Sequence, residues 1–147
     1  MVVRRERVVP AAPAEVWGIV SDPTRLAAWW PGVSRVEEAS REAWTTVLVS
    51  KTGKTVRADY SLVEAAEPQR VLWRHEVAAS PFERLLREST TEIALAPDAE
   101  GGTKVRVTLD QRPAGWARFS PFQLRAAARR QAELALEGLA GLLGDGR

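Results

Sequence analysis

The chain has 147 residues and a mass of 16.2 kDa, with 21 Lys and Arg residues against 19 Asp and Glu residues. This length suits one domain with one core, and a formal charge of +2 is too small to make nucleic acid the default partner. The sequence has no cysteine and one histidine, which excludes disulfides, thiolate metal sites, thiol nucleophiles and multi-histidine metal sites. We therefore expect a single domain over residues 1–147 with no metal and no cofactor.

The first predicted elements are a strand and two short helices. Residues Val2 to Val9 are predicted to form the strand. Pro13 suits the first turn of a helix, and Asp22 is a typical cap for a second helical segment, Pro23 to Trp29. Helices this short are not stable alone. We therefore expect them to form a bracket that docks on the rest of the fold.

From Val33 to Asp110 the sequence pattern predicts an antiparallel meander. Short runs rich in Val, Thr, Leu and Trp are separated by Gly, Pro, Asp and Ser, which is typical of strands and turns. Thr52-Gly53 predicts one tight hairpin, and Asp98 to Gly102 predicts another. The predicted strands cover residues 33–39, 44–51, 54–64, 70–78, 87–96 and 103–111.

Alternation within three of these strands predicts which side chains face the core. One face of the last strand is apolar and the other is charged, as expected of a sheet with one dry side. The run from Trp44 to Lys51 is apolar on both faces, so its orientation stays open. The predicted inward residues are Val56, Ala58, Tyr60, Leu62, Val71, Trp73, His75, Val77, Val105, Val107 and Leu109.

A long helix is predicted to follow, with Ser120 as its cap, Pro121 in its first turn and its end near Gly144. The whole chain is therefore an α+β protein in which this helix covers one face of a seven-stranded sheet. Small side chains on the helix predict unfilled volume between helix and sheet. The alternative is that Trp side chains from the sheet fill the space. The small residues are Ala126, Ala127, Ala128, Ala132 and Ala135.

Five runs of sequence carry a resemblance to a known family. They are Val8-Val9-Pro10-Ala11-Ala12-Pro13-Ala14-Glu15-Val16-Trp17, Ser21-Asp22-Pro23, Trp29-Trp30-Pro31-Gly32-Val33, Pro68-Gln69-Arg70-Val71-Leu72-Trp73 and Gly102-Thr103-Lys104-Val105. In this order and spacing they resemble the START-like, helix-grip (SRPBCC) superfamily, particularly its polyketide cyclase/dehydrase-like branch.

The resemblance implies a curved seven-stranded antiparallel sheet wrapped around a long C-terminal helix, with two short helices between strands 1 and 2. It also implies that a small hydrophobic or amphipathic molecule binds between sheet and helix. A minority of the superfamily are aromatase/cyclases, and no family-wide catalytic motif can be carried over to residues of this chain.

The expected ligand contacts are Tyr60, Trp73, His75 and Thr91 on the strands, with Ala128 and Ala132 on the helix. If the protein is an enzyme, we expect a cyclase or dehydratase acting on a polyketide-type substrate, with His75 as the acid/base and Tyr60 as an orienting donor. The structural alternatives are that His75 is a hydrogen-bonded core residue, that Tyr60 sits at a rim, and that Thr91 is merely a good strand former.

Three further features could bear on binding. Trp29-Trp30 could form a lid over the cavity or pack on the core, and Ser80 to Leu86 could form a mobile flap or an ordinary loop. A cluster of arginines could steer an anionic ligand, meet an acidic protein surface beside a vestigial pocket, or simply be a solvated helix face. The cluster is Arg112, Arg118, Arg125, Arg129 and Arg130.

The start of the chain gives an expectation about location. The charged residues Arg4-Arg5-Glu6-Arg7 are followed by Pro10 and Pro13, and no apolar run approaches the length of a membrane helix. We therefore expect a cytoplasmic protein with no integral membrane segment, whose partner is a small molecule rather than nucleic acid.

Overall fold

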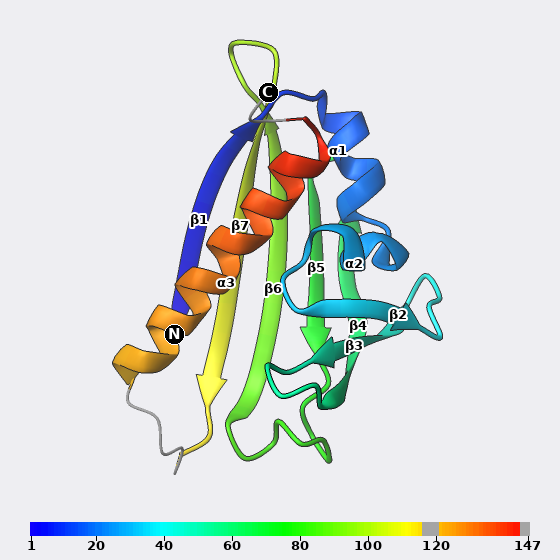
Figure 1. Cartoon of the computed structure of the whole chain (residues 1–147). Helices are drawn as coiled ribbons and strands as arrows, with labels where there is room; N and C mark the ends of the chain where they lie inside the picture. The colour runs from blue at the N-terminus through cyan, green and yellow to red at the C-terminus, as the bar shows by residue number, and fades with distance from the viewer. Residues whose placement is uncertain (116–120, 145–147) are drawn as a thin grey trace.

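A seven-stranded antiparallel sheet in the order β1-β7-β6-β5-β4-β3-β2 forms the centre of the computed structural model, which describes residues 1–115 and 121–144 (Figure 1). Helices pack on one face of this sheet. The elements in chain order are β1 (Val2–Val9), α1 (Pro13–Val20), the 3-10 turn η1 (Pro23–Arg25), α2 (Leu26–Trp29), β2 (Val33–Glu37), β3 (Ala43–Val49), β4 (Thr55–Ala66), β5 (Arg70–His75), β6 (Leu86–Pro97), β7 (Thr103–Pro113) and α3 (Pro121–Leu142).

This arrangement confirms the predicted fold class and the order of its elements. Pro13 occupies the first turn of α1, and the Asp22 carboxylate accepts a hydrogen bond from the Thr24 amide at 3.0 Å. Gly53 and Gly101 adopt positive φ angles in the two predicted hairpins. Three strands end before the predicted bounds: β2 ends at Glu37 rather than at residue 39, β3 ends at Val49 rather than at residue 51, and β5 ends at His75 rather than at residue 78. The predicted cap Ser120 lies outside the described residues.

Helix α3 crosses the sheet over β1 and β7, and its second half meets α2 (Figure 1). The approach of the two helices is close, because a Cβ atom added to Gly138 would lie 2.3 Å from the Trp29 carbonyl oxygen. Glycine is the residue that permits this contact. The short helices are therefore held by docking on α3 and the sheet, as their length requires.

The face of α3 that meets the sheet is a stripe of residues three or four positions apart, as helix geometry requires. Ala128, Ala132 and Ala135 belong to this stripe and are almost fully buried. The placement of Ala126 and Ala127 on the inner face was wrong, because both fall off the stripe and are exposed. These three alanines, with Ala140 further along α3, face the core, and they bring the helix close to the strands.

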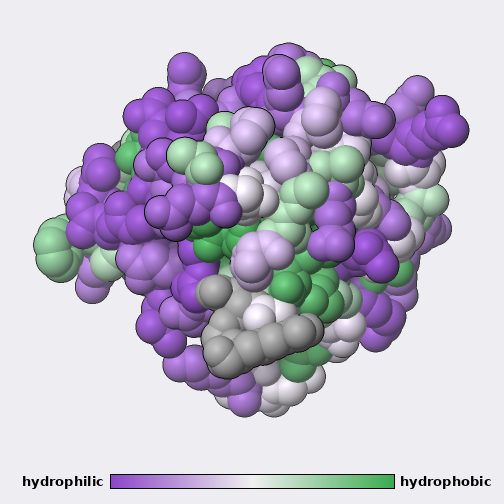
Figure 2. Space-filling model, turned by 90° about the horizontal axis from the view of Figure 1, so that it is seen from above, coloured by the Kyte–Doolittle hydropathy of each residue, from purple (hydrophilic) through white to green (hydrophobic). Residues whose placement is uncertain are grey.

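The opposite face of the sheet is covered by charged and hydroxyl groups. Glu92 pairs with Arg70 and Arg106 across neighbouring strands. Asp59 accepts a hydrogen bond from Thr45, and Glu76 accepts one from the Ser61 hydroxyl at 2.6 Å. These carboxylates lie on the face of the sheet opposite the core, as expected where side chains alternate along a strand. Seen from above, the molecule is hydrophilic around most of its edge, and apolar side chains lie among polar ones over the middle of this view (Figure 2).

Candidate ligand-binding site

A row of aromatic side chains lies on the inner face of the sheet. The ring of Trp73 on β5 contacts Trp30 edge to face, with centroids 5.8 Å apart, and contacts Trp44 on β3 at 6.0 Å. Trp44 in turn stacks on Tyr60 of β4 at 6.1 Å. These contacts orient β3, whose facing the sequence left open, with Trp44 toward the core. The predicted contacts Tyr60 and Trp73 therefore share one aromatic surface.

His75 extends this surface and ends in an unpaired nitrogen. The imidazole stacks on Tyr60 with centroids 4.8 Å apart and meets the edge of Phe82 at 4.7 Å. It is 6% exposed, and its Nε2 atom has no hydrogen-bond partner among the described residues. Burial lowers the pKa of His75, against the opposing influence of the Asp59 and Glu76 carboxylates. The side chain is therefore a neutral imidazole at pH 7 with a free polar atom inside the protein.

Tyr60 is held in the phenol form. Burial raises the pKa of Tyr60 to about 12, so its hydroxyl keeps its proton throughout the physiological range. A buried phenol of this kind can donate a hydrogen bond to a carbonyl group. Tyr60 can therefore orient a ligand but does not supply a phenolate.

Polar side chains continue from Tyr60 across the sheet. Tyr60 pairs with His75, and Ser89 pairs with Gln111. Arg74 pairs with Thr90, so the next residues along the two strands, His75 and Ser89, lie side by side on the inner face. One row of polar side chains thus crosses β4, β5, β6 and β7. We call it the polar row, and its members are Tyr60, His75, Ser89 and Gln111.

Among residues 1–115 and 121–144, the spaces found between the helices and the inner strands are small, in place of the single large cavity that the small helix residues predicted. Two small, partly open pockets of about 40 Å³ each lie between the helices and β3, β4 and β5. Each has room for about one water molecule, because a water in the liquid occupies about 30 Å³. Indole rings fill the remaining volume, as the alternative predicted. We call the space bordered by Trp30, Trp44, Tyr60, Trp73 and Gln131 the inner pocket.

An open groove of about 460 Å³ runs beside the inner pocket, between α3, the turn from α2 to β2, and β7. Gln131 borders both spaces, and the turn residues Pro31 and Gly32 lie between Trp30 and Val33 of the inner pocket. Groove and pocket are therefore neighbours separated by one glutamine side chain and one turn. The groove, which we call the α3 groove, is lined by Pro31, Gly32, Gln111, Leu124, Ala127, Ala128, Arg130, Gln131 and Leu134.

The predicted contact residues occupy different parts of this site. Tyr60 and Trp73 border the inner pocket, and Ala128 borders the α3 groove. The His75 ring stacks on Tyr60, on the polar row. Thr91 lies buried beside Trp73 in the sheet, and Ala132 is fully buried; within the described part of the chain, neither borders the pocket or the groove.

Sequence reasoning missed three polar residues of the site. Gln111 continues the inward alternation of Val107 and Leu109, and so could have been placed on the inner face. Gln131 stands three residues after Ala128, inside the apolar stripe of α3. Ser89 shares the inward alternation of Thr91. A polar residue at an inward position was the available signal in each case.

The structure also shows where the tryptophan pair and the arginine cluster lie. Trp29 and Trp30 are buried and contact each other at 5.3 Å, so they pack on the core and Trp30 borders the inner pocket. Arg112 pairs with Glu88, and Arg125 donates to the Val2 carbonyl. Arg129 and Arg130 are exposed on α3, and Arg118 lies outside the described residues.

The buried imidazole predicts a pH-dependent stability. Because the pKa of His75 is lower in the folded state than its ordinary value near 6.5, the unfolded chain binds a proton that the folded chain does not. The free energy of unfolding should therefore fall as the pH drops below about 6.5, by up to about 1.4 kcal/mol per pH unit, until the folded-state pKa is reached.

The matched variant is His75→Phe, which keeps a ring on Tyr60 but does not titrate. Urea unfolding at pH 7.5, 6.5 and 5.5 should give a flatter profile for H75F than for the natural chain. Equal slopes in the two proteins would show that His75 is not the group responsible.

Within residues 1–115 and 121–144, no three His, Cys, Asp or Glu side chains come together as a metal site would require. No helix in the described part of the chain combines the length and apolar character needed to cross a membrane.

Solved structures of other proteins share this fold. A START superfamily protein from Mycobacterium smegmatis superimposes with a TM-score of 0.80 at 15% identity, covering 97% of this chain and 96% of the other. A protein from Thermus thermophilus gives 0.73 at 23% identity, with 97% of each chain covered. The XoxI protein of Bacillus cereus gives 0.77 at 14% identity, covering 98% and 96%. At these identities the likeness establishes the fold.

The sequence itself carries the family assignment. No protein with a curated function matches it significantly. The family model described as polyketide cyclase / dehydrase and lipid transport matches residues 1–144. The match spans all three helices and all seven strands described above, including the α3 groove and the inner pocket. The chain therefore belongs to the polyketide cyclase / dehydrase and lipid transport family, within the START-like fold.

Proposed function

We propose that this protein binds a small hydrophobic or amphipathic molecule, which lies in the α3 groove and reaches the inner pocket. The observation that carries the proposal is the adjacency of the two spaces at Gln131. The groove alone has the volume of an ordinary small-molecule site, which runs from about 300 to 1,000 Å³. The inner pocket adds aromatic surface from Trp73 and Tyr60 at its end.

The chemistry of the lining supports a largely apolar ligand with a few hydrogen-bonding groups. Leu124, Ala127 and Leu134 give the groove an apolar wall, and Gln111 and Gln131 give it two amides. Further in, the Tyr60 phenol and the unpaired Nε2 of His75 could meet a carbonyl or hydroxyl group. A buried polar atom without a partner is costly, so a ligand that satisfies His75 gains affinity from it.

The test uses two neighbouring alanines of α3. Ala127 and Ala126 are both exposed, but only Ala127 lines the groove. Ala127→Trp should fill the groove and abolish ligand retention, while Ala126→Trp, the matched control, should leave it unchanged. Native mass spectrometry of the three proteins purified from the source organism measures the bound mass.

We expect one additional mass on the natural protein and on A126W, and its absence from A127W. Retention of the same mass by A127W, or no bound mass on the natural protein, would contradict the proposal.

A second candidate function is a polyketide-type cyclase. It is favoured by the stacking of a neutral His75 on a protonated Tyr60, which pairs a base with a hydrogen-bond donor. The same mass spectra separate the two functions. A bound molecule that is released unchanged supports binding, whereas a molecule that loses water on the protein supports the enzyme.

A further inference from the structure

The segment between β5 and β6 places one aromatic ring on the polar row. Residues 78–85 of this segment are called the flap; of the run Ser80 to Leu86 named in the sequence analysis, Leu86 belongs to β6. Phe82 is its half-buried aromatic residue, and its ring lies edge to face on His75 with centroids 4.7 Å apart. The row itself is open to the α3 groove at Gln111 and borders the inner pocket at Tyr60. Between these ends, His75 and Ser89 are buried.

The flap is held mainly by bonds within itself and to Val77, the residue just before it. The Ser80 hydroxyl donates to the Val77 carbonyl at 2.6 Å, and the Ala79 amide donates to the Glu83 carboxylate at 3.0 Å. Ala79 has a φ angle of 57°, a left-handed conformation that is unfavourable for a residue with a Cβ. At the end of the flap, the amide of Ala114, the residue after β7, donates a hydrogen bond to the Leu85 carbonyl.

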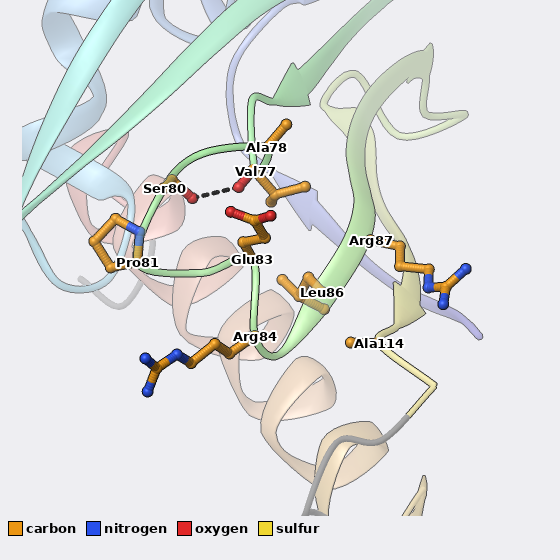
Figure 3. Close-up of a pocket in the computed structure, with 9 residues that line it drawn as sticks. All are labelled: Val77, Ala78, Ser80, Pro81, Glu83, Arg84, Leu86, Arg87 and Ala114. Atoms are coloured by element: carbon orange, nitrogen blue, oxygen red, sulfur yellow. Dashed lines mark hydrogen bonds between the residues drawn. The ribbon is translucent and has the colours of Figure 1, made fainter.

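Among the described residues, the flap also borders a hollow. It has a volume of about 830 Å³ and is lined by flap residues together with Val77, Leu86, Arg87 and Ala114 (Figure 3). In this view Arg84 and Arg87 point away from Glu83, so no side chain bridges the hollow from those positions. Phe82 is not among the residues that line it. The segment therefore has room to move while its own turn stays intact.

We propose that Phe82 is a plug that occupies a subsite for a flat aromatic ring, and that a ring of the ligand replaces it on His75. The inference rests on the proposed function, since it concerns the same site. The described aromatic contact of Phe82 is a single edge-to-face contact, on His75, which a ligand ring can replace with a contact of the same kind. Its release joins the α3 groove, the polar row and the inner pocket into one site.

The closed state lowers the apparent affinity for any ligand that needs this subsite. If the open state is a minor fraction of the molecules, the measured Kd rises in inverse proportion to that fraction. Removal of the Phe82 ring should therefore tighten binding without any new contact to the ligand. It should also bring solvent to His75, which is the single histidine of the chain and so gives one resolved NMR signal.

The test compares Phe82→Ala with Leu85→Ala. Leu85 also lies in the flap, but its side chain has no aromatic ring that could contact His75. In the absence of ligand, the NMR titration of F82A should show a His75 pKa closer to the ordinary value than in the natural protein, while L85A should match the natural protein.

The probe for the subsite is 8-anilinonaphthalene-1-sulfonate, whose binding is followed by its fluorescence. All three proteins carry the same charge, so differences report access rather than electrostatics. We expect F82A to bind at least tenfold more tightly.

Phe82→Leu is the second variant, for use if F82A does not fold, because it keeps an apolar side chain without the ring. It should change the His75 pKa and the probe affinity in the same direction as F82A. An unchanged His75 pKa in both Phe82 variants would overturn the plug. A raised pKa with unchanged probe binding would overturn the replacement by a ligand ring. Neither result affects the groove, which the Ala127→Trp experiment tests separately.

Discussion

Replacement of Trp73 by alanine should lower the free energy of unfolding by about 3–5 kcal/mol, the range found for large aromatic residues removed from cores. Trp73 is 4% exposed and its indole ring contacts both Trp30 and Trp44. It also borders both small pockets, so its removal would merge them into one larger void. Neighbouring rings on other elements cannot close such a void without moving their backbones.

Guanidinium chloride unfolding at pH 7 measures this loss. The control is Phe122→Ala, since Phe122 is 79% exposed and its removal should change stability by less than about 0.5 kcal/mol. Domains of this size are stable by about 5–15 kcal/mol, so W73A could leave little folded protein. Trp73→Phe keeps a ring and should give an intermediate loss. A loss below about 1 kcal/mol in W73A would show that the rings do not form a packed unit.

Gly138→Ala should destabilise the protein by about 2 kcal/mol, even though alanine is the better helix former by about 1 kcal/mol. The added Cβ would lie 2.3 Å from the Trp29 carbonyl oxygen and 3.1 Å from its carbon. Both are backbone atoms, so α2 and α3 must separate. Because Trp30 follows Trp29, the separation also disturbs the inner pocket.

Gly141→Ala is the matched substitution on the same helix. A Cβ at Gly141 would meet nothing within 4 Å, so this variant should gain up to about 1 kcal/mol. Thermal and urea unfolding of the two variants should thus give shifts of opposite sign. If G138A were as stable as G141A, the contact between α2 and α3 would not be as close as described.

The sequence was sufficient for the architecture because its signals are local. Proline positions marked the starts of α1 and η1, and glycine in left-handed conformations marked the hairpins at Gly53 and Gly101. Alternation placed Tyr60, Trp73 and His75 on one face, where the structure has them. Each of these signals depends on a residue and its close neighbours in the chain.

The interior could not be predicted in the same way, because it depends on contacts between distant elements. Small residues at Ala128 and Ala132 were expected to leave a cavity, but they bring α3 closer to the strands instead. The remaining space is taken by Trp30, Trp44 and Trp73, which come from three separate elements. Side-chain volumes alone do not tell how near two elements lie. The α3 groove depends on the same long-range packing.

The position of β1 determines when the site can form. Val2 pairs with Asp110, and the first strand therefore has its partner only when β7 has been made. Pairings between segments far apart in the sequence close slowly, because the intervening loop must lose entropy first. Gln111 lies in β7, and α3 follows it. During synthesis on the ribosome, the aromatic strands β3, β4 and β5 therefore emerge before β7 and α3, and a ligand can be captured only after both of these have been made.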